Sequence, residues 1–334
     1  MSEKQDDFLE NVLVPALLVS TCVPAIICNS LVLLVLRCSP RMRQTSSNNL
    51  VFSLALADLF HVVTYTPTKI IQYRYKEAWV WGDWACRATI YFKDMSLSIT
   101  QYTLVLMALN RYLAVALPSH GLTRALHRHS DAAAVAIWLL MPVANSLSFF
   151  LYGVREFVPD KGVSPDVVLT VCTFLYLESF FTYQLVLFLL FYVVPVSLIS
   201  AFYVLLAMAL RNQLPNGGHE APQVTRAARI VVGFVISFVV LSTPLQVMGL
   251  CFSAGLLPNR PWVRVMSIVF QVLAQLNCIV DPLLFTFMNT SFRKEIRRLL
   301  LRRRRVQECQ CQHCDELPYT ETVAITSITR VDVS

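Results

Sequence analysis

Five polar residues that interrupt long apolar stretches could hold a cation or share a proton. They are Asn29, Asp58, Thr100, Asn277 and Asp281. Asn277 and Asp281 are four positions apart, so they lie on one face of a helix. Polar groups at membrane depth are costly and usually face the interior of a helix bundle, and two neighbouring carboxyl groups cannot both ionise cheaply. The cluster of Asp58, Thr100, Asn277 and Asp281 is therefore a candidate sodium site, or else a set of mutually satisfied polar groups.

Cationic residues form a second pattern. Lys93 and Arg111 are 18 residues apart, which is five helical turns and about 27 Å, so they lie on one face at opposite ends of a helix. Lys69 follows Asp58 by about three turns on nearly the same face. We expect an anion-binding pocket in which glutamines are neutral donors. Its expected members are Lys69, Lys93, Arg264, Gln246, Gln271 and Gln275. Alternatively, Asp94 and Glu178 neutralise Lys93 and Lys69 internally.

The elements that must position these residues are apolar segments of membrane-spanning length. The chain has 334 residues, of which 56% are hydrophobic and 15% charged, whereas soluble proteins carry about 25% charged residues. This composition excludes a disordered chain, a secreted disulfide scaffold and an ordinary nucleic-acid-binding protein. Segments of about 20 apolar residues can cross a bilayer. The expected spans are 12–36, 50–71, 88–117, 132–152, 185–210, 230–254 and 265–288.

These spans predict an all-α membrane protein with seven transmembrane helices and a short amphipathic eighth helix. We expect a short extracellular tail over 1–11, the bundle over 12–288, the basic amphipathic helix over 289–305 and a disordered cytosolic tail over 306–334. Lys and Arg concentrate in the first, third and fifth connectors and after the last span. Cytoplasmic loops carry this excess, so the N-terminus is expected outside and the C-terminus in the cytosol.

The C-terminal tail carries three further signals. Arg302–Arg305 follow the amphipathic helix and should attract anionic lipid headgroups. Cysteines beside such a helix are candidates for palmitoylation, although a metal site would also use these residue types. The cysteines are Cys309, Cys311 and Cys314, and the hydroxyl residues that could recruit arrestin after phosphorylation are Thr320, Thr322, Thr326, Ser327 and Thr329.

Taken in order over residues 10–300, the motifs in these spans resemble those of rhodopsin-like (class A) G-protein-coupled receptors. The match rests on ordered positions rather than on one motif. The positions are Asn29, Leu54–Asp58, Trp79 to Gly82 with Cys86, Asn110-Arg111-Tyr112, Trp138, Pro195, Tyr203, Phe238, Pro244 and Asp281–Phe285. Residues 66–71, Pro261-Trp262 and 281–285 further resemble the purinergic and free-fatty-acid branch. Gln184 and Ser267 replace the arginines of the fatty-acid receptors, which argues against short-chain fatty acids as ligands.

The resemblance implies a plasma-membrane receptor that is not an enzyme and has no cofactor beyond a structural sodium ion. It implies a disulfide between Cys86 and Cys172. Its partners would be an extracellular ligand, a heterotrimeric G protein of the inhibitory type, arrestin and membrane lipids, with no nucleic acid. The residues implied in coupling are Asn110, Arg111, Tyr112 and Tyr203.

Two departures from the family pattern bear on signalling. Asn110 replaces the acid that usually restrains Arg111, and Val224 and Thr225 stand where span six usually carries another acid. We therefore expect appreciable basal signalling, unless Asn110 merely hydrogen-bonds Arg111 or coupling is impaired. Ser242 replaces the usual span-six Trp, so Phe238 or another aromatic side chain must link the ligand to helix movement.

The favoured function is a receptor for an anionic small molecule that activates its G protein by outward movement of span six. A peptide receptor of the same class and a non-signalling receptor-like decoy or scaffold are the alternatives. A transporter or channel would show internal repeats or a continuous charged pathway, and neither is evident in the sequence.

Overall fold

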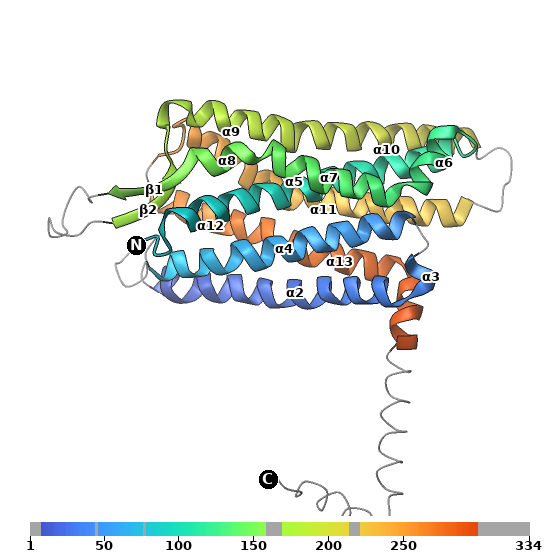
Figure 1. Ribbon diagram of the computed structural model, residues 1–334, viewed down its shortest axis with the longest axis horizontal. Helices are drawn as coiled ribbons and strands as arrows, with labels where there is room; N and C mark the ends of the chain where they lie inside the picture. The colour runs from blue at the N-terminus through green and yellow to red at the C-terminus, as the bar shows by residue number, and fades with distance from the viewer. Residues whose placement is uncertain are drawn as a thin grey trace, which may run out of the picture. The chain divides into compact units, whose positions relative to one another are not determined.

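The computed structural model describes residues 8–43, 46–75, 78–157, 169–213, 221–258 and 260–299. The chain divides into two units at Asn289. The first unit is a bundle of nearly parallel helices, and Figure 1 shows the β1–β2 hairpin at one end with α3 and α6 at the other. We call these the hairpin end and the α3 end. In the second unit, residues 290–299 are helical.

Within the described residues the bundle contains seven helical spans, several of them built from consecutive helices. Span one is η1 (Leu9–Leu13) with α2 (Val14–Cys38), span two is α4 (Ser46–Arg74) and span three is α5 (Gly82–Ala116). Span four is α7 (Ser130–Ala144) with α8 (Ser146–Leu151). Span five joins η2 (Leu177–Ser179), α9 (Phe180–Phe188), η3 (Leu189–Val193) and α10 (Val194–Gln213). Span six is α11 (Ala221–Ser253), and span seven is α12 (Pro261–Gln275) with α13 (Asn277–Met288). The elements that connect the spans are α3 (Pro40–Arg43), α6 (Gly121–Arg128), β1 (Tyr152–Phe157) and β2 (Leu169–Phe174).

The predicted seven-helix bundle is confirmed, although most spans are longer than expected. Within the described residues, six helical segments are long and apolar enough to cross a membrane, and α5 is more polar. At 35 residues, α5 is about 52 Å long. It packs against α4, α7, α8, α10, α11 and β1, which shield it from lipid. Buried hydroxyl and amide side chains such as Ser96, Ser98, Gln101 and Thr103 are tolerated there because neighbouring helices, not lipid, surround them.

The connector between spans four and five contains a β-hairpin, which was not predicted from the sequence. β1 pairs with β2 in antiparallel register, with Val154 opposite Cys172. β2 has the alternation of β-branched and apolar residues that suits a strand. A disulfide joins Cys172 to Cys86 in the first turns of α5, with their Cα atoms 5.6 Å apart. The hairpin is thereby anchored to the third span.

Asp83 makes a second anchor between the hairpin and α5. One of its carboxylate oxygens accepts a hydrogen bond from the Val154 N–H at 2.9 Å, and the other accepts one from Arg87 Nε at 2.6 Å. A Cβ atom at Gly153 would lie 2.8 Å from Asp83 Oδ1, so this approach requires glycine.

Two prolines each leave a backbone carbonyl inside the bundle without its helical partner, and a side chain from another span donates a hydrogen bond to that carbonyl. Proline has no N–H, so a carbonyl one turn earlier loses its partner. Pro282 removes the partner of the Cys278 carbonyl, and Asn29 Nδ2 donates to that oxygen at 2.7 Å. In span five, η3 is a π-turn in which the Val194 N–H bonds the Leu189 carbonyl. The next carbonyl in that pattern, Leu190, would need the N–H that Pro195 lacks, and it accepts a hydrogen bond from the Tyr102 hydroxyl at 3.0 Å.

The predicted boundaries near both chain ends shift or lie outside the described residues. η1 begins at Leu9, so helix replaces part of the tail expected over 1–11. The basic helix expected over 289–305 is helical over 290–299. The tail residues singled out above, namely Arg302–Arg305, Cys309, Cys311, Cys314 and the Thr/Ser cluster, lie outside the described residues.

Candidate functional site

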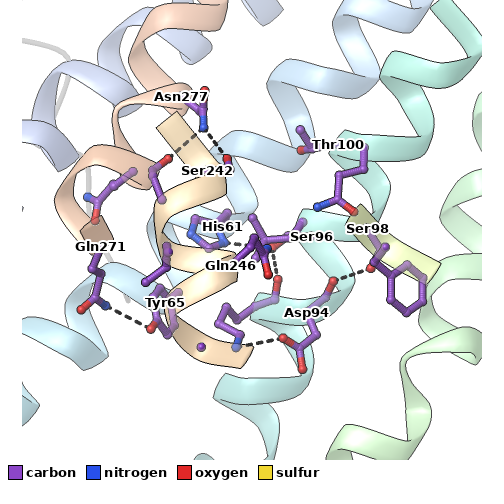
Figure 2. A pocket seen from close by; sticks show the side chains of 18 of the residues that line it. His61, Tyr65, Asp94, Ser96, Ser98, Thr100, Ser242, Gln246, Gln271 and Asn277 are labelled. Atoms are coloured by element: carbon purple, nitrogen blue, oxygen red, sulfur yellow. Dashed lines mark hydrogen bonds and ion pairs between the residues drawn. The ribbon is translucent and has the colours of Figure 1, made fainter. Parts of the chain in front are cut away.

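A central cavity of about 360 Å³ lies among α4, α5, span five, α11 and span seven. Figure 2 shows its polar side chains converging from these helices. Aromatic and aliphatic residues of span five and α11 form an apolar wall, which includes Phe188, Phe191, Leu245 and Leu250. Five of the six predicted ligand-binding residues line this cavity, namely Lys69, Lys93, Gln246, Gln271 and Gln275. The combination of an apolar wall with a few convergent polar groups is typical of a ligand site.

Arg264 is the predicted ligand-binding residue that the structure leaves out of the cavity lining. It lies in the first turn of α12, where its side chain is exposed. The spacing of Arg264 from Ser267, Gln271 and Gln275 places it on the helical face that lines the cavity, but it lies nearer the end of the span than these lining residues. Arg264 therefore does not line this cavity, and its part in ligand binding stays a prediction.

The two lysines differ in how their charges are compensated. Lys93 Nζ forms an ion pair with Asp94 Oδ1 at 2.9 Å, which is the internal pairing considered from the sequence. Lys69 Nζ donates to Gln72 Oε1 at 2.8 Å and lies 5.8 Å from the centroid of the Tyr65 ring. Glu178 does not pair with Lys69 among the described contacts. The cavity therefore carries less net positive charge than the sequence suggested.

The glutamines of span seven connect helices as well as lining the cavity. Gln271 Nε2 donates to the Tyr65 hydroxyl at 3.1 Å, and its Oε1 accepts a hydrogen bond from the Tyr73 hydroxyl at 3.2 Å. Gln275 Nε2 donates to Thr21 Oγ1 at 2.9 Å. Gln271 is thus held by span two, and Gln275 by span one. Gln246 of α11 lines the cavity between these groups and α5 (Figure 2).

Sequence reasoning missed His61 and Tyr65, which both line the cavity. His61 Nδ1 is hydrogen-bonded with Ser96 Oγ at 3.1 Å, joining α4 to α5. The signal for both residues was present in the sequence. Asp58, His61, Tyr65 and Lys69 follow an i, i+3, i+7, i+11 spacing, which places all four on one helical face.

Three members of the predicted ion cluster, Asp58, Thr100 and Asn277, line the same cavity, whereas Asp281 does not line it. Thr100 Oγ1 donates to Asp58 Oδ1 at 3.2 Å, and Asn277 Nδ2 donates to Ser242 Oγ at 2.9 Å. The carboxyl groups of Asp281 and Asp58 are close enough to interact electrostatically. Three buried oxygens of this cluster have no hydrogen-bond partner within the described structure, namely Asp58 Oδ2, Asn277 Oδ1 and Asp281 Oδ1. Unpartnered carboxylate and amide oxygens are ligands that hard cations prefer.

Span six connects to spans five and seven beneath the cavity. Phe238 is buried, lines the cavity and lies with its ring 5.9 Å from that of Tyr192. The Tyr192 hydroxyl is hydrogen-bonded with Thr243, and Ser242 accepts the bond from Asn277. Phe238 therefore occupies a place from which contact with a ligand could move α11, and Ser242 links that helix to span seven.

At the α3 end, Arg111 is held by a hydroxyl group rather than by an acid. Its guanidinium donates to Ser47 Oγ of α4. Tyr112 stacks on Phe202, with ring centroids 6.2 Å apart, and Tyr203 packs with Val115 and Leu206. The side chains of Val224 and Thr225 lie outside the described residues.

Comparisons with known proteins agree with this architecture. Residues 28–285 match the family model described as 7 transmembrane receptor (rhodopsin family). The chain is 30% identical over 277 residues to the allatostatin-A receptor of Bombyx mori, covering 81% of this chain and 75% of that protein. It is 28% identical to the neuropeptide CCHamide-1 receptor of Drosophila melanogaster, covering 87% of this chain and 60% of that receptor. It is 28% identical to the human neuropeptides B/W receptor type 2, covering 86% of each.

The helices, the central cavity and these matches agree on one kind of molecule, a multi-pass membrane protein that transmits a signal and performs no catalysis. The chain belongs to the rhodopsin family of seven-transmembrane, G-protein-coupled receptors.

Proposed function

We propose that this chain is a plasma-membrane receptor that binds the end of an extracellular peptide in the central cavity and activates a heterotrimeric G protein. The relatives described above carry the names of peptide receptors. The anionic small molecule favoured from the sequence, and with it the purinergic and fatty-acid branch, gains no support from them. The observation that carries the proposal is the ion pair between Lys93 and Asp94, because it removes the charge on which the anion hypothesis most depended.

The chemistry of the cavity suits a peptide end. Glutamine and tyrosine side chains, including Gln246, Gln271 and Tyr65, offer uncharged donors and acceptors, which match the N–H and C=O groups of a peptide. Lys69 remains able to form an ion pair with an acidic group of the peptide. A cavity of about 360 Å³ is at the small end of the range for ligand sites, so it holds a few peptide residues and leaves the rest at the hairpin end. We place the hairpin end outside the cell because Lys and Arg concentrate at the α3 end.

A direct test is nucleotide exchange on purified heterotrimers, including the inhibitory type, with two ligand panels. One panel contains synthetic peptides of the classes named for the relatives, and the other contains carboxylate and phosphate metabolites. We expect a peptide response whose potency falls about tenfold in Gln246→Leu, as for the loss of one hydrogen bond in a desolvated site. Glu156→Gln on β1 is the control and should leave potency unchanged. A response to a metabolite alone, abolished by Lys69→Gln, would contradict the peptide assignment.

We also propose that the receptor signals without ligand, because a hydroxyl group restrains Arg111 less than a carboxylate would. Asn110→Asp should lower ligand-free nucleotide exchange about fivefold, since an ion pair between the introduced carboxylate and Arg111 should stabilise the resting state by about 1 kcal/mol. Ser119→Asp adds the same charge in the exposed turn after α5 and should not change the rate. If wild-type receptor shows no exchange above receptor-free membranes, with or without peptide, the non-signalling decoy is the better description.

A sodium ion at the cluster of Asp58, Thr100, Asn277 and Asp281 is a further part of the proposal. The three unpartnered oxygens described above support it. Replacing N-methylglucamine chloride by NaCl at equal ionic strength should raise Tm by a few degrees, since sodium at ten times its Kd stabilises the folded state by about 1.4 kcal/mol. Asp58→Asn should remove the difference, and Asp83→Asn at the hairpin end should retain it. Equal Tm in both salts for wild type would show that the polar groups satisfy one another instead.

Palmitoylation of Cys309, Cys311 and Cys314 and the recruitment of arrestin by the Thr/Ser cluster stay predictions, because those residues lie outside the described part of the chain. Acyl-exchange labelling of single Cys→Ser variants would test the first. Arrestin recruitment by a variant truncated after Arg305 would test the second.

A further inference from the structure

A second cavity, of about 420 Å³, lies at the α3 end among α2, α3, α4 and α7, separate from the central cavity. Its walls are apolar and include Phe52, Leu56, Val135 and the indole of Trp138. Leu56 and Val135 are exposed, so the cavity opens on the side of the bundle that faces lipid. We call it the lipid-side groove.

The groove is a fixed feature of the helix packing. Trp138 Nε1 donates to Ser53 Oγ at 3.0 Å, which holds the indole against α4. Ala134 stands one turn before Trp138 on α7 and also lines the groove. Its small side chain leaves open the space that a larger residue on this face would fill.

Two exposed residues of opposite charge line the polar end of the groove. Arg37 lies in the last turn of α2, and Asp131 lies in the first turn of α7. Both residues are exposed, and no ion pair or hydrogen bond of either side chain is formed with any described residue. They are the second-to-last residue of one membrane-spanning segment and the second residue of another. Both charges therefore lie at the boundary of the apolar region, the depth at which phospholipid headgroups are found.

We propose that the lipid-side groove binds one phosphatidylethanolamine molecule, with its phosphate on Arg37, its ammonium on Asp131 and an acyl chain along Trp138. A guanidinium group makes strong charge-assisted hydrogen bonds to phosphate, and a carboxylate accepts them from an ammonium group. The headgroup of phosphatidylethanolamine carries both the phosphate and the ammonium group, joined by a short ethylene linker.

The charges and hydrogen-bond requirements of the site exclude the other common lipids. The quaternary ammonium of phosphatidylcholine has no N–H to donate to Asp131. Phosphatidylserine brings a carboxylate toward Asp131, where like charges repel. A sterol hydroxyl would leave both Arg37 and Asp131 uncompensated.

The test is native mass spectrometry of the full receptor released from nanodiscs that contain equal mole fractions of phosphatidylethanolamine, phosphatidylcholine and phosphatidylserine. We expect wild type to retain phosphatidylethanolamine about tenfold more than phosphatidylcholine, as for one charge-assisted hydrogen bond. Asp131→Asn should abolish this preference while phospholipid binding persists. Arg37→Gln should reduce retention of all three lipids.

Two further variants separate a specific site from general loss of structure. Ala134→Leu leaves both charges in place but fills the groove, so it should reduce phosphatidylethanolamine retention without changing nucleotide exchange. Arg124→Gln removes a cation from exposed α6 at the same end and should behave as wild type. Equal retention of the three lipids by wild type, an unchanged preference in Asp131→Asn, or displacement of the bound lipid by cholesterol would overturn the proposal.

Discussion

Replacing Cys86 and Cys172 together with serine is expected to abolish most of the ligand response and to produce the largest fall in Tm of any pair of substitutions considered. The disulfide closes a loop with a sequence separation of 86 residues. Chain entropy gives an upper bound of about 4–5 kcal/mol for a loop of that length. The actual loss will be smaller, because helices inserted in a bilayer already restrict the unfolded chain.

The effect on ligand binding follows from the position of the hairpin. Tyr152, at the start of β1, interacts electrostatically with Lys93 and Asp94, and its ring lies 5.3 Å from that of Phe174 at the end of β2. Without the disulfide, Asp83 and the Trp79 N–H, which donates to the Thr170 carbonyl at 2.7 Å, still attach the strands but do not fix them covalently. Potency should therefore fall at least about tenfold, which corresponds to about 1.4 kcal/mol.

Radioligand binding and thermal unfolding check this prediction, with Cys251→Ser as the matched control because Cys251 is a free cysteine. A reducing agent should lower the Tm of wild type and of Cys251→Ser but should leave the Cys86→Ser/Cys172→Ser variant unchanged. Wild-type potency and Tm in the double variant would show that hydrogen bonds alone hold the hairpin.

The second large effect is expected at the junction of spans one and seven. Asn29 Nδ2 satisfies the Cys278 carbonyl that Pro282 leaves without a partner. Asn29→Ala exposes that buried oxygen to an apolar environment, which should cost about 1–3 kcal/mol. Pro282→Ala restores a backbone N–H to the helix, so Asn29→Ala should cost clearly less in that background.

Thermal unfolding of the four proteins in this double-mutant cycle measures the coupling directly, and residues in contact typically show about 0.5–3 kcal/mol. Ser20→Ala is the control on the same helix, because Ser20 is exposed and donates within its own helix to the Leu17 carbonyl at 2.8 Å. An equal loss of stability from Asn29→Ala in both backgrounds would mean that the hydrogen bond does not compensate for the proline.

The positions of the spans follow from local sequence because the bilayer is a local requirement. Each segment must satisfy its own backbone by forming a helix and must present apolar side chains over the thickness of the hydrocarbon region. All seven spans were identified in this way from the sequence. The third is more polar than the other six, because α5 is surrounded by other helices and its composition is not constrained by lipid. The candidate residues of the ion cluster could also be picked out from the sequence, since they are polar residues that interrupt apolar membrane-spanning segments.

The partners of polar side chains were decided only by the tertiary structure. Arg111 pairs with Ser47 of another span, and Asn29 with a carbonyl 249 residues away. Each choice depends on the rotation and depth of one helix relative to another, and shifts of a fraction of a turn exchange one partner for the next. The approach of Arg37 and Asp131 to the lipid-side groove has the same origin. The sequence by itself therefore determined which segments cross the membrane and which residues are polar within them, and helix packing determined what those residues contact.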